Sequence, residues 1–431
     1  MQPPTPPPVE IRDPLHGAIP VDERELSVVD HPFVQRLRGI RQLGYSHLPF
    51  PGATHSRYSH SLGAMHLAGL AFDACFRGQQ FSTPAVGQAY RHSVRLAALC
   101  HDLGHAPFSH AAEFAMPALH LLGIDCYAPS KAAAARQASH EDYTIAILTR
   151  SGLAGCIEAS FPFSARHVAA LVSPEVQLTD DFFVDDGCDH RGLLSQLVSS
   201  DLDVDRLDYL VRDSYYTGAR YGQVDVHWLI SNLSRHVDPQ ERICLALDGR
   251  ALYAFDDFMV ARLHMFLMVY FHQKSIAYEH LLQRFMREPG CDYQLPADLD
   301  AYLECDDAHL QAHLRGSSSE WARRLVEQRP YKLALEVQGS PSEVDMEARA
   351  QRVRDAGIDV MTASSIGAVF GGRKPGKLPM YVLDRRPGSA PLALPVEEAS
   401  RVFDRYEDAR CIGRLYVPED RVHAARAIVA P

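Results

Sequence analysis

A histidine and an aspartate are adjacent at His101-Asp102, in a stretch that also holds His105 and His110. Neighbouring imidazole and carboxylate groups at the end of a helix can direct two different ligand atoms at one metal ion. A lone His-Asp pair also arises by chance, and its aspartate is then more often a helix cap or a surface group. The pair therefore indicates a metal site only if other candidate ligands accompany it in the sequence.

Two other segments concentrate residues of the same kinds. The upstream segment 55–61 reads HSRYSHS and contains His60, just before a predicted helix. The downstream segment 201–213 places Asp205, Tyr209 and Asp213 on one stripe of a helix, at spacings of four residues. Such a stripe is too acidic to be buried without partners. Either it is a solvated face, or a metal ion satisfies Asp205 at low cost.

The elements that must position these residues are predicted to be helices. Apolar residues recur at helical spacing in six segments: Phe33–Leu43, Leu62–Phe76, Tyr90–Leu103, Arg166–Val172, Leu193–Tyr209 and Phe258–Met286. One interruption predicts a β-hairpin, with strands Arg242–Leu247 and Ala251–Phe255 joined across Asp248-Gly249.

The C-terminal part has a different pattern of predicted elements. After Pro289-Gly290 the predicted helices shorten, and strand-like pieces follow at Pro379–Leu383 and Arg414–Val417. We therefore expect a mainly α protein, a helical bundle with a small C-terminal α+β lobe. The expected divisions are an extended Pro-rich lead (1–9), the bundle (10–290), a helical connection (291–339) and the lobe (340–431).

Composition narrows the class of protein. The formal charge is −11, from 43 basic and 54 acidic residues, which argues against non-specific nucleic-acid binding. No run of 18 apolar residues and no secretory leader is evident, so we expect neither a membrane partner nor secretion. Nine cysteines without a CxxC pair indicate thiols in a reducing compartment, which predicts a cytoplasmic protein.

In chain order, His60, His101-Asp102 and Asp205 match the H…HD…D motif of HD-domain phosphohydrolases. The sequence resembles in particular the deoxynucleoside triphosphate (dNTP) triphosphohydrolase branch, which includes dGTPases and sterile-alpha-motif/HD-domain enzymes. The shared segments are Asp13–Gly17, Phe33–Gly44, Phe50–Gly63, Cys100–His110 and Asp203–Asp213. The resemblance is strong over residues 10–290, where it implies an HD phosphohydrolase domain, and weak in the C-terminal lobe.

The resemblance implies one divalent transition metal ion per subunit, either Mn, Fe, Ni, Co or Zn, with Mg as a further candidate. Its ligands would be His60, His101, Asp102 and Asp205. Two imidazoles and two carboxylates leave coordination positions open for water and a phosphate oxygen, which is typical of a catalytic site. Such an ion lowers the pKa of a bound water and polarises the P–O bond.

In the related enzymes the attacked phosphorus is the α one, and the products are a deoxynucleoside and intact triphosphate. The leaving 5′-oxygen then needs a proton. The resemblance implies His110 as the acid, His105 and His140 as phosphate contacts, and Glu113 as the carboxylate that supports one of them. Capping or packing roles for these histidines are the alternative.

The resemblance also implies the residues that bind substrate. They are Arg57, Arg206 and Arg262 for the phosphates; Tyr209 and Asp213 for the sugar; Gln42 and Leu43 beneath the 3′-hydroxyl; and Tyr270 and His272 to complete the pocket. A tyrosine packed beneath C2′ favours deoxyribose over ribose.

Regulation by a guanine nucleotide is implied by three further positions, Asp30, Gln35 and Arg38, which would bind GTP or dGTP in a homotetramer or dimer of dimers. Alternatively, Asp30 caps the helix that starts near Pro32. The chain departs from the vertebrate pattern at two positions: Phe266 replaces a histidine of the vertebrate enzyme, and Gln273 replaces a lysine. The sequence therefore does not predict which dNTP is preferred.

The sequence thus predicts metal-dependent hydrolysis of dNTPs. One alternative is an HD phosphohydrolase that acts on a nucleoside monophosphate, a cyclic nucleotide or a guanosine alarmone. A second is a catalytically silent nucleotide-sensing module, although the complete ligand set argues against it. A nucleic-acid role is the third, and the net charge counts against it.

Overall fold

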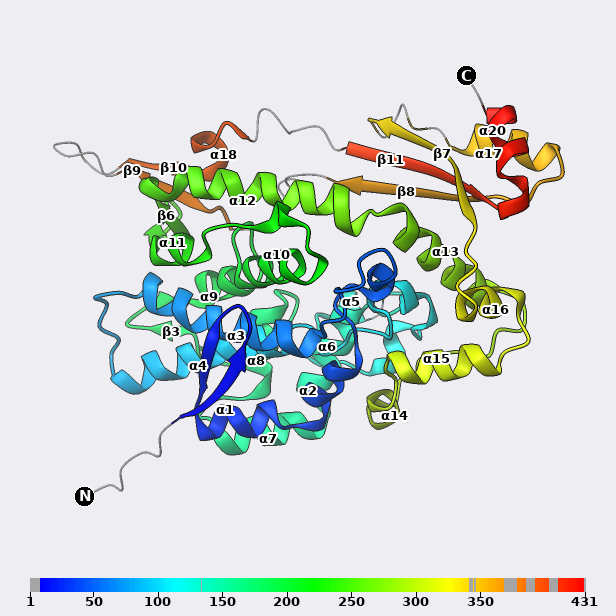
Figure 1. Cartoon of the computed structure of the whole chain (residues 1–431). Coiled ribbons are helices and arrows are strands. Elements are labelled where there is room, and N and C mark those ends of the chain that lie inside the picture. Colours follow the sequence, from blue (N-terminus) through cyan, green and yellow to red (C-terminus); the bar gives the residue numbers. More distant parts are fainter. Residues whose placement is uncertain are drawn as a thin grey trace.

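The computed structural model describes residues 8–132, 134–340, 344, 346–367, 378–384, 392–402 and 410–429. The predicted lead at 1–9 therefore lies almost wholly outside the described residues. The fold is mainly α, as predicted. Figure 1 shows a broad helical body with two small sheets along one side.

The helical body begins with a hairpin and is built mostly of helices. Its strands are β1 (Val9–Asp13) and β2 (Gly17–Val21), with a second, two-residue hairpin β3 (Val184–Asp185) and β4 (Cys188–Asp189). Its helices are α1 (Glu23–Val29), α2 (Pro32–Arg36), α3 (Arg57–Cys75), α4 (Pro84–Cys100), α5 (Pro129–Ala132), α6 (His140–Arg150), α7 (Gly152–Ser160), α8 (Ala165–Val172), α9 (Arg191–Val198), α10 (Val204–Thr217), α11 (Val226–Ser231), α12 (Leu252–Met265), α13 (Gln273–Arg287), α14 (Leu299–Leu303), α15 (Asp307–Gly316) and α16 (Glu320–Val326).

Helix α3 is the centre of this body. Its residues are buried on almost every side, and it packs against α4 and α10. Close packing requires small residues: a Cβ added at Gly63 would lie 1.9 Å from the Asp208 carboxylate on α10. Helix α10 begins at an N-cap, Asp203, whose carboxylate accepts a hydrogen bond from Arg206 N, and ends at Gly218 with φ +74°.

Three of the predicted helices are interrupted, and side-chain caps mark two of the interruptions. The segment Phe33–Leu43 is helical only to Arg36, and a 3-10 turn, Leu37–Gly39, follows. Asp203 divides Leu193–Tyr209 into α9 and α10. A π-helical turn, Phe266–Tyr270, and the cap His272 separate α12 from α13.

The predicted hairpin across Asp248-Gly249 is wrong. Strand β6 (Ile243–Asp248) pairs instead with the preceding strand, β5 (Leu233–Val237). The Asp248 carboxylate accepts a hydrogen bond from Arg250 N, and a 3-10 turn leads into α12. Helix α12 buries Phe255, Phe258 and Met259 on one face, which explains why this stretch is helical.

The C-terminal stretch does not form one lobe over 340–431. Strands β9 (Tyr381–Asp384) and β10 (Leu392–Pro395) join the sheet of the helical body in the order β10-β9-β6-β5, followed by α18 (Val396–Ala399). A separate sheet, β7-β11-β8, combines β7 (Lys332–Gly339), β8 (Met361–Gly367) and β11 (Arg410–Val417) with α17 (Glu347–Asp355) and α20 (Val422–Val429) around a second apolar core. Figure 1 shows these two sheets apart from one another.

Across the described ranges, every helix is too short or too polar to span a bilayer.

Candidate active site

The four predicted metal ligands converge from three helices. His60 lies in α3, His101 and Asp102 follow the last turn of α4, and Asp205 lies in the first turn of α10. His60 Nε2 is 3.0 Å from Asp205 Oδ1 and 3.3 Å from His101 Nε2, and His101 Nε2 is 3.3 Å from Asp102 Oδ1. Ligand atoms of His60, His101 and Asp102 all lie within 4.8 Å of one another, and Asp205 approaches the two histidines of this group, with Oδ1 3.4 Å from His101 Nε2.

The orientation of both imidazoles fits a cation. His60 Nδ1 is 2.8 Å from Asp208 Oδ2, and His101 Nδ1 is 2.7 Å from the Ala98 carbonyl oxygen. These acceptors hold a proton on Nδ1, so the two Nε2 lone pairs face one another. Two lone pairs 3.3 Å apart repel unless a proton or a cation lies between them. The residues present thus fit a divalent metal ion.

The protonation of His60 leads to the same conclusion. Although burial alone would lower it, hydrogen bonds to Asp205 and Asp208 raise the pKa of His60 to about 10. The bonds to His101 and His60 hold the pKa of Asp205 well below its usual range, against the effect of burial. In the metal-free protein a proton thus takes the place that a cation would occupy.

A buried network fixes the orientation of His60. Asp208 accepts hydrogen bonds from Arg212 at 2.8 and 2.9 Å and is 2.6 Å from His16 Nε2. Arg212 also donates to Asp13 at 2.8 Å, and Asp13 holds the turn that carries His16. No role for Asp208, Arg212 or His16 was predicted from the sequence. The repeated acidic residues of α10 gave no sign of which one is paired internally.

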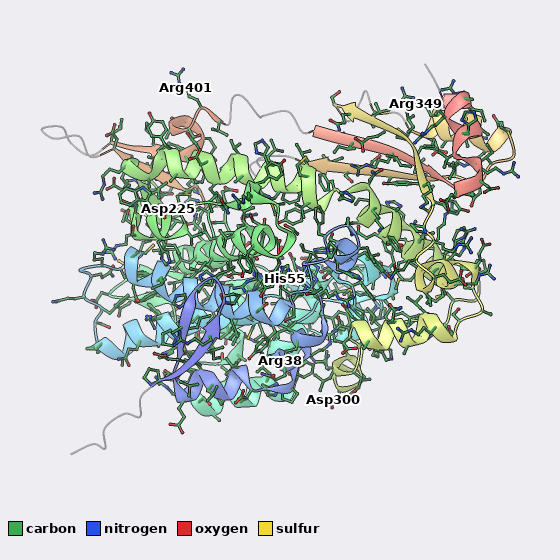
Figure 2. The ribbon with its side chains drawn as sticks, viewed as in Figure 1. Arg38, His55, Asp225, Asp300, Arg349 and Arg401 are labelled. Carbon is green, nitrogen blue, oxygen red and sulfur yellow. The ribbon has the colours of Figure 1, made fainter. Side chains whose placement is uncertain are left out.

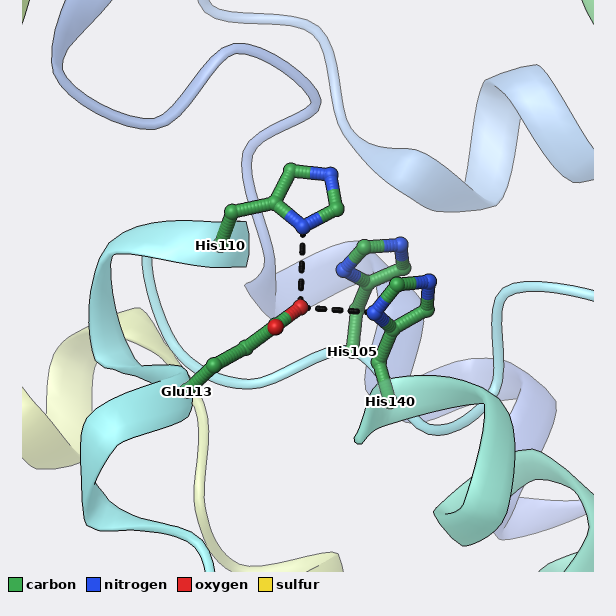
Figure 3. A group of neighbouring side chains, drawn as sticks. All are labelled: His105, His110, Glu113 and His140. Atoms are coloured by element: carbon green, nitrogen blue, oxygen red, sulfur yellow. Dashed lines mark hydrogen bonds and ion pairs between the residues drawn. The ribbon is translucent and has the colours of Figure 1, made fainter. Parts of the chain in front are cut away.

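A second cluster contains His105, His110, Glu113 and His140 (Figure 3). Glu113 Oε1 lies 2.8 Å from His110 Nδ1 and 2.6 Å from His140 Nδ1. The His105 ring is stacked on that of His140 at 4.1 Å between centroids, and its Nε2 is 3.3 Å from Asp102 Oδ1. Asp102 therefore connects this cluster to the metal ligands.

The members of this cluster differ in charge and exposure. Burial, with Arg57 and His140 nearby, holds the pKa of His105 well below its usual range, so His105 is neutral. The bonds from His110 and His140 lower the pKa of Glu113, although burial opposes them. The side chain of His110 is 67% exposed, whereas that of His140 is 22% exposed. His110 is thus the histidine most open to an entering group.

The predicted substrate residues fall into two groups. A cavity of about 500 Å³ is lined by Gln42, Leu43, Arg57, Tyr209, Asp213 and Tyr270 together with His101, Asp102 and Asp205. Arg206, Arg262 and His272 are not among its lining residues. Arg206 pairs with Asp203 at 2.5 Å, Arg262 lies over the Phe266 ring, and His272 caps α13.

Within the cavity, each of two predicted residues has one partner that was not predicted, Ser109 for Arg57 and His55 for Asp213. Arg57 donates to Asp102 at 2.5 Å and to Ser109 Oγ at 3.0 Å. Asp213 accepts from Tyr270 Oη at 2.7 Å and lies 2.8 Å from His55 Nε2. His55, labelled near the middle of Figure 2, is buried and fixes this carboxylate. His55 is the first residue of the HSRYSHS motif, but only His60 and Arg57 of that motif were given roles from the sequence.

Of the predicted effector residues, Gln35 lies in α2 and Arg38 in the turn after it, whereas Asp30 is the C-cap of α1. Arg38 Nε donates to Gln35 Oε1 at 2.7 Å, and its guanidinium lies 3.6 Å from the centre of the Tyr58 ring. Asp30 ends α1, and the cap of α2 is His31, so the alternative capping role for Asp30 is wrong. Figure 2 labels Arg38 on the side of the molecule away from the C-terminal sheets.

Of the two departures, Phe266 lines the cavity with its ring edge-on to Tyr270, 5.0 Å between centroids. Gln273 is exposed at the start of α13.

Comparisons with known proteins agree with this geometry. Residues 57–159 match the HD domain model and residues 224–367 match the HD associated region model. The chain is 31% identical to the uncharacterized protein YwfO of Bacillus subtilis (strain 168) over 281 residues, 64% of this chain and 54% of that protein. It is 30% identical to the deoxynucleoside triphosphate triphosphohydrolase SAMHD1 homolog of Dictyostelium discoideum over 274 residues, 63% of this chain and 48% of that protein.

Among solved structures, a hypothetical protein from Aquifex aeolicus superposes with a TM-score of 0.75 at 25% identity, covering 98% of this chain and 100% of that one. The matches span only about half the length of the curated relatives. The chain thus matches the HD domain over residues 57–159, where His60, His101 and Asp102 lie, and is similar over part of its length to relatives named deoxynucleoside triphosphate triphosphohydrolase.

Proposed function

We propose that this protein hydrolyses dNTPs to a deoxynucleoside and intact triphosphate, with a divalent metal ion as cofactor. The observation that carries the proposal is one cavity that is lined by members of three groups. They are three of the four proposed metal ligands (His101, Asp102 and Asp205), the three histidines around Glu113 (His105, His110 and His140), and the group Tyr209, Asp213 and Tyr270. The similarity to relatives named deoxynucleoside triphosphate triphosphohydrolase supports it.

The metal would be held by His60, His101, Asp102 and Asp205. When bound, it supplies Lewis acidity that lowers the pKa of a water molecule and polarises the α-phosphate. We expect a divalent transition metal, with Mg as a further candidate. Arg57 supports this centre because its guanidinium bonds Asp102 and so fixes the carboxylate.

His110 is the proposed acid for the leaving 5′-oxygen. Its Nδ1 is held by Glu113 at 2.8 Å, and its exposed ring directs Nε2 away from that contact, where it could donate a proton. His105 and His140 stack beside it and would contact phosphate. Arg206 and Arg262 would have to turn towards the cavity to reach the triphosphate, because Arg206 pairs with Asp203.

The sugar would lie against Tyr209 and Tyr270. Their rings are arranged edge to face at 6.2 Å, which forms a narrow wall. Asp213 accepts from Tyr270 and faces the same cavity as Gln42 and Leu43, so it can accept a hydrogen bond from the 3′-hydroxyl. Activation by GTP or dGTP at Asp30, Gln35 and Arg38, in a homotetramer or dimer of dimers, belongs to the same proposal.

The test is product analysis with the purified chain. Each dNTP is incubated with Mn²⁺ or Mg²⁺, with and without GTP or dGTP, and the products are separated by ion-pairing chromatography. We expect deoxynucleoside and intact triphosphate, lost in Asp205→Ala and retained in the surface variant Asp73→Asn.

Release of monophosphate and pyrophosphate would contradict the proposed reaction. Cleavage of a nucleoside monophosphate, a cyclic nucleotide or an alarmone, without turnover of any dNTP, would favour another HD phosphohydrolase. Nucleotide binding without turnover of any of these substrates would favour a sensing module.

A further inference from the structure

The turn that leads to His110 has an unusual backbone. Phe108 and Ser109 both adopt left-handed conformations, with φ of 53° and 60°. Such conformations cost free energy for residues other than glycine, and two in succession persist only where the surrounding structure enforces them. Neighbouring contacts must therefore hold this turn.

Helix α15 supplies one such contact. Asp307, its first residue, is 7% exposed, and its Oδ1 accepts a hydrogen bond from Phe108 N at 2.7 Å. Its other oxygen, Oδ2, accepts from Arg41 N at 3.1 Å. One buried carboxylate thus joins the turn before His110 to the strand-like segment before Gln42.

Ser109 makes a second link between the same two segments. Its hydroxyl donates to the Arg41 carbonyl at 3.0 Å and accepts from Arg57 Nε at 3.0 Å. The close approach also requires Gly44, whose φ is +47° and where a Cβ would lie 3.0 Å from the Phe108 carbonyl oxygen. The position of His110 relative to Gln42 and Arg57 therefore depends on this turn.

Residues near Asp307 also contact the loop that precedes Phe108, at Gly104 and His105. Tyr302 of α14 donates to the Gly104 carbonyl at 2.8 Å. Arg36 of α2 donates to the carbonyls of His105 and Cys305 at 3.0 and 2.5 Å. Residues 302–307, in the HD associated region, thus hold the loop that carries His105 and His110.

We propose that Asp307 is a positioning residue for the active site, whose carboxylate fixes the Phe108–Ser109 turn against Arg41 and so places His110 over the cavity. The proposal rests on the proposed function for its kinetic consequence, but the fixed turn can be tested without substrate. Burial raises the pKa of this carboxyl to about 6, against its two backbone hydrogen bonds, so a stability cost accompanies its placement.

The matched pair of variants is Asp307→Asn and Asp306→Asn. Asp306 precedes Asp307 and caps α15 by accepting from His309 N at 2.8 Å, but it bonds neither Phe108 nor Arg41. Asparagine at 307 keeps one acceptor and presents its amide nitrogen to a backbone N–H, so one of the two bonds is lost. Asp307→Ala loses both bonds.

We expect kcat for dNTP hydrolysis to fall roughly 10-fold in Asp307→Asn and up to about 100-fold in Asp307→Ala, since small misplacements of an acid are that costly. KM should change less than about threefold, because the sugar and phosphate contacts remain. Bound metal should stay at the wild-type level, and Asp306→Asn should keep the wild-type kcat.

Hydrogen exchange supplies the readout that needs no substrate. Amides of residues 106–111 should exchange faster in both Asp307 variants than in wild type and Asp306→Asn, with no change in α3. Unchanged exchange there would refute the fixed turn even if the protein hydrolyses no dNTP. Faster exchange with unchanged kcat would refute the positioning role, and equal losses of kcat in Asp306→Asn and Asp307→Asn would indicate a general effect on α15. If Asp307→Ala does not fold, Asp307→Asn decides the outcome.

Discussion

At the residue scale, one carboxylate determines how His60 presents its ligand atom. Asp208 is fully buried, and its carboxylate is bonded by His60, His16 and Arg212. Second-layer carboxylates of this kind fix the imidazole tautomer and raise its basicity. The metal site of this protein therefore depends on a residue that would not itself touch the metal.

Asp208→Asn should weaken metal binding roughly 10- to 100-fold, because the amide cannot accept from His60, His16 and Arg212 together. Binding of Mn²⁺ by titration calorimetry measures the change. Asp73→Asn, which removes only a surface ion pair with Arg91, is the control. An affinity within twofold of wild type would show that Asp208 serves packing alone.

Glu279 is a cavity-lining carboxyl whose ionisation should affect the stability of the protein. It lines the cavity, no hydrogen bond or ion pair to it is found among the described residues, and burial raises its pKa to about 7. A raised carboxyl pKa means that the folded state holds its proton longer than the unfolded chain does. Stability therefore falls as the pH rises from about 4.5 to about 7, and the penalty is constant above that.

Glu279→Gln removes this ionisation. The variant should match wild type near pH 4.5 and be more stable by about 3 kcal/mol above pH 7. Chemical denaturation at several pH values measures the difference. A constant difference across this range would mean that the ionisation of Glu279 is not the cause.

At the scale of elements, the sequence predicted the helices that carry ligands but not how they are joined. Helical periodicity located α3, α4 and α10, and the motif order placed His60, His101-Asp102 and Asp205 on them. Periodicity could not show that Asp203 divides the predicted segment Leu193–Tyr209 into α9 and α10, because a cap depends on one side chain.

Contacts between distant segments were beyond prediction for a similar reason. Strand β6 was predicted, but its true partners are β5 and the distant β9, and no local pattern encodes a pairing across more than 130 residues. Asp307 likewise showed no local sign of its contact with Phe108. Sequence patterns give faces and periods, whereas these features arise only when the chain is folded.

The packing of α3 on α10 gives a prediction at this scale. At Gly63 a Cβ would lie 1.9 Å from Asp208 Oδ1 and 2.5 Å from Arg212 Nη2. Gly63→Ala should therefore force the helices apart, lower the stability by about 1–3 kcal/mol and weaken metal binding. Thermal unfolding and calorimetry measure both effects.

Gly155→Ala is the matched control. Gly155 lies within α7 with nothing within 4 Å of an added Cβ, so alanine there should raise the stability by about 0.5–1 kcal/mol. Equal effects of the two substitutions would show that the α3–α10 contact tolerates a methyl group.

At the scale of the whole molecule, metal binding should be coupled to stability and to pH. The ligands come from α3, α10 and the end of α4, so an ion that binds only the folded state joins elements of the central bundle. His60 must lose its proton to bind a cation, and its pKa of about 10 means that it carries that proton in the metal-free protein.

Metal affinity should consequently rise about tenfold for each pH unit between pH 6 and pH 8.5, with at least about one proton released per ion. The increase in Tm on adding Mn²⁺ to the chelator-treated protein should then grow with pH, because tighter binding stabilises the folded state more. Calorimetry in buffers of different ionisation enthalpy counts the protons, and Asp205→Ala should abolish both the Tm increase and the proton release. An affinity and a Tm increase that do not depend on pH in this range would show that His60 is already neutral without the metal.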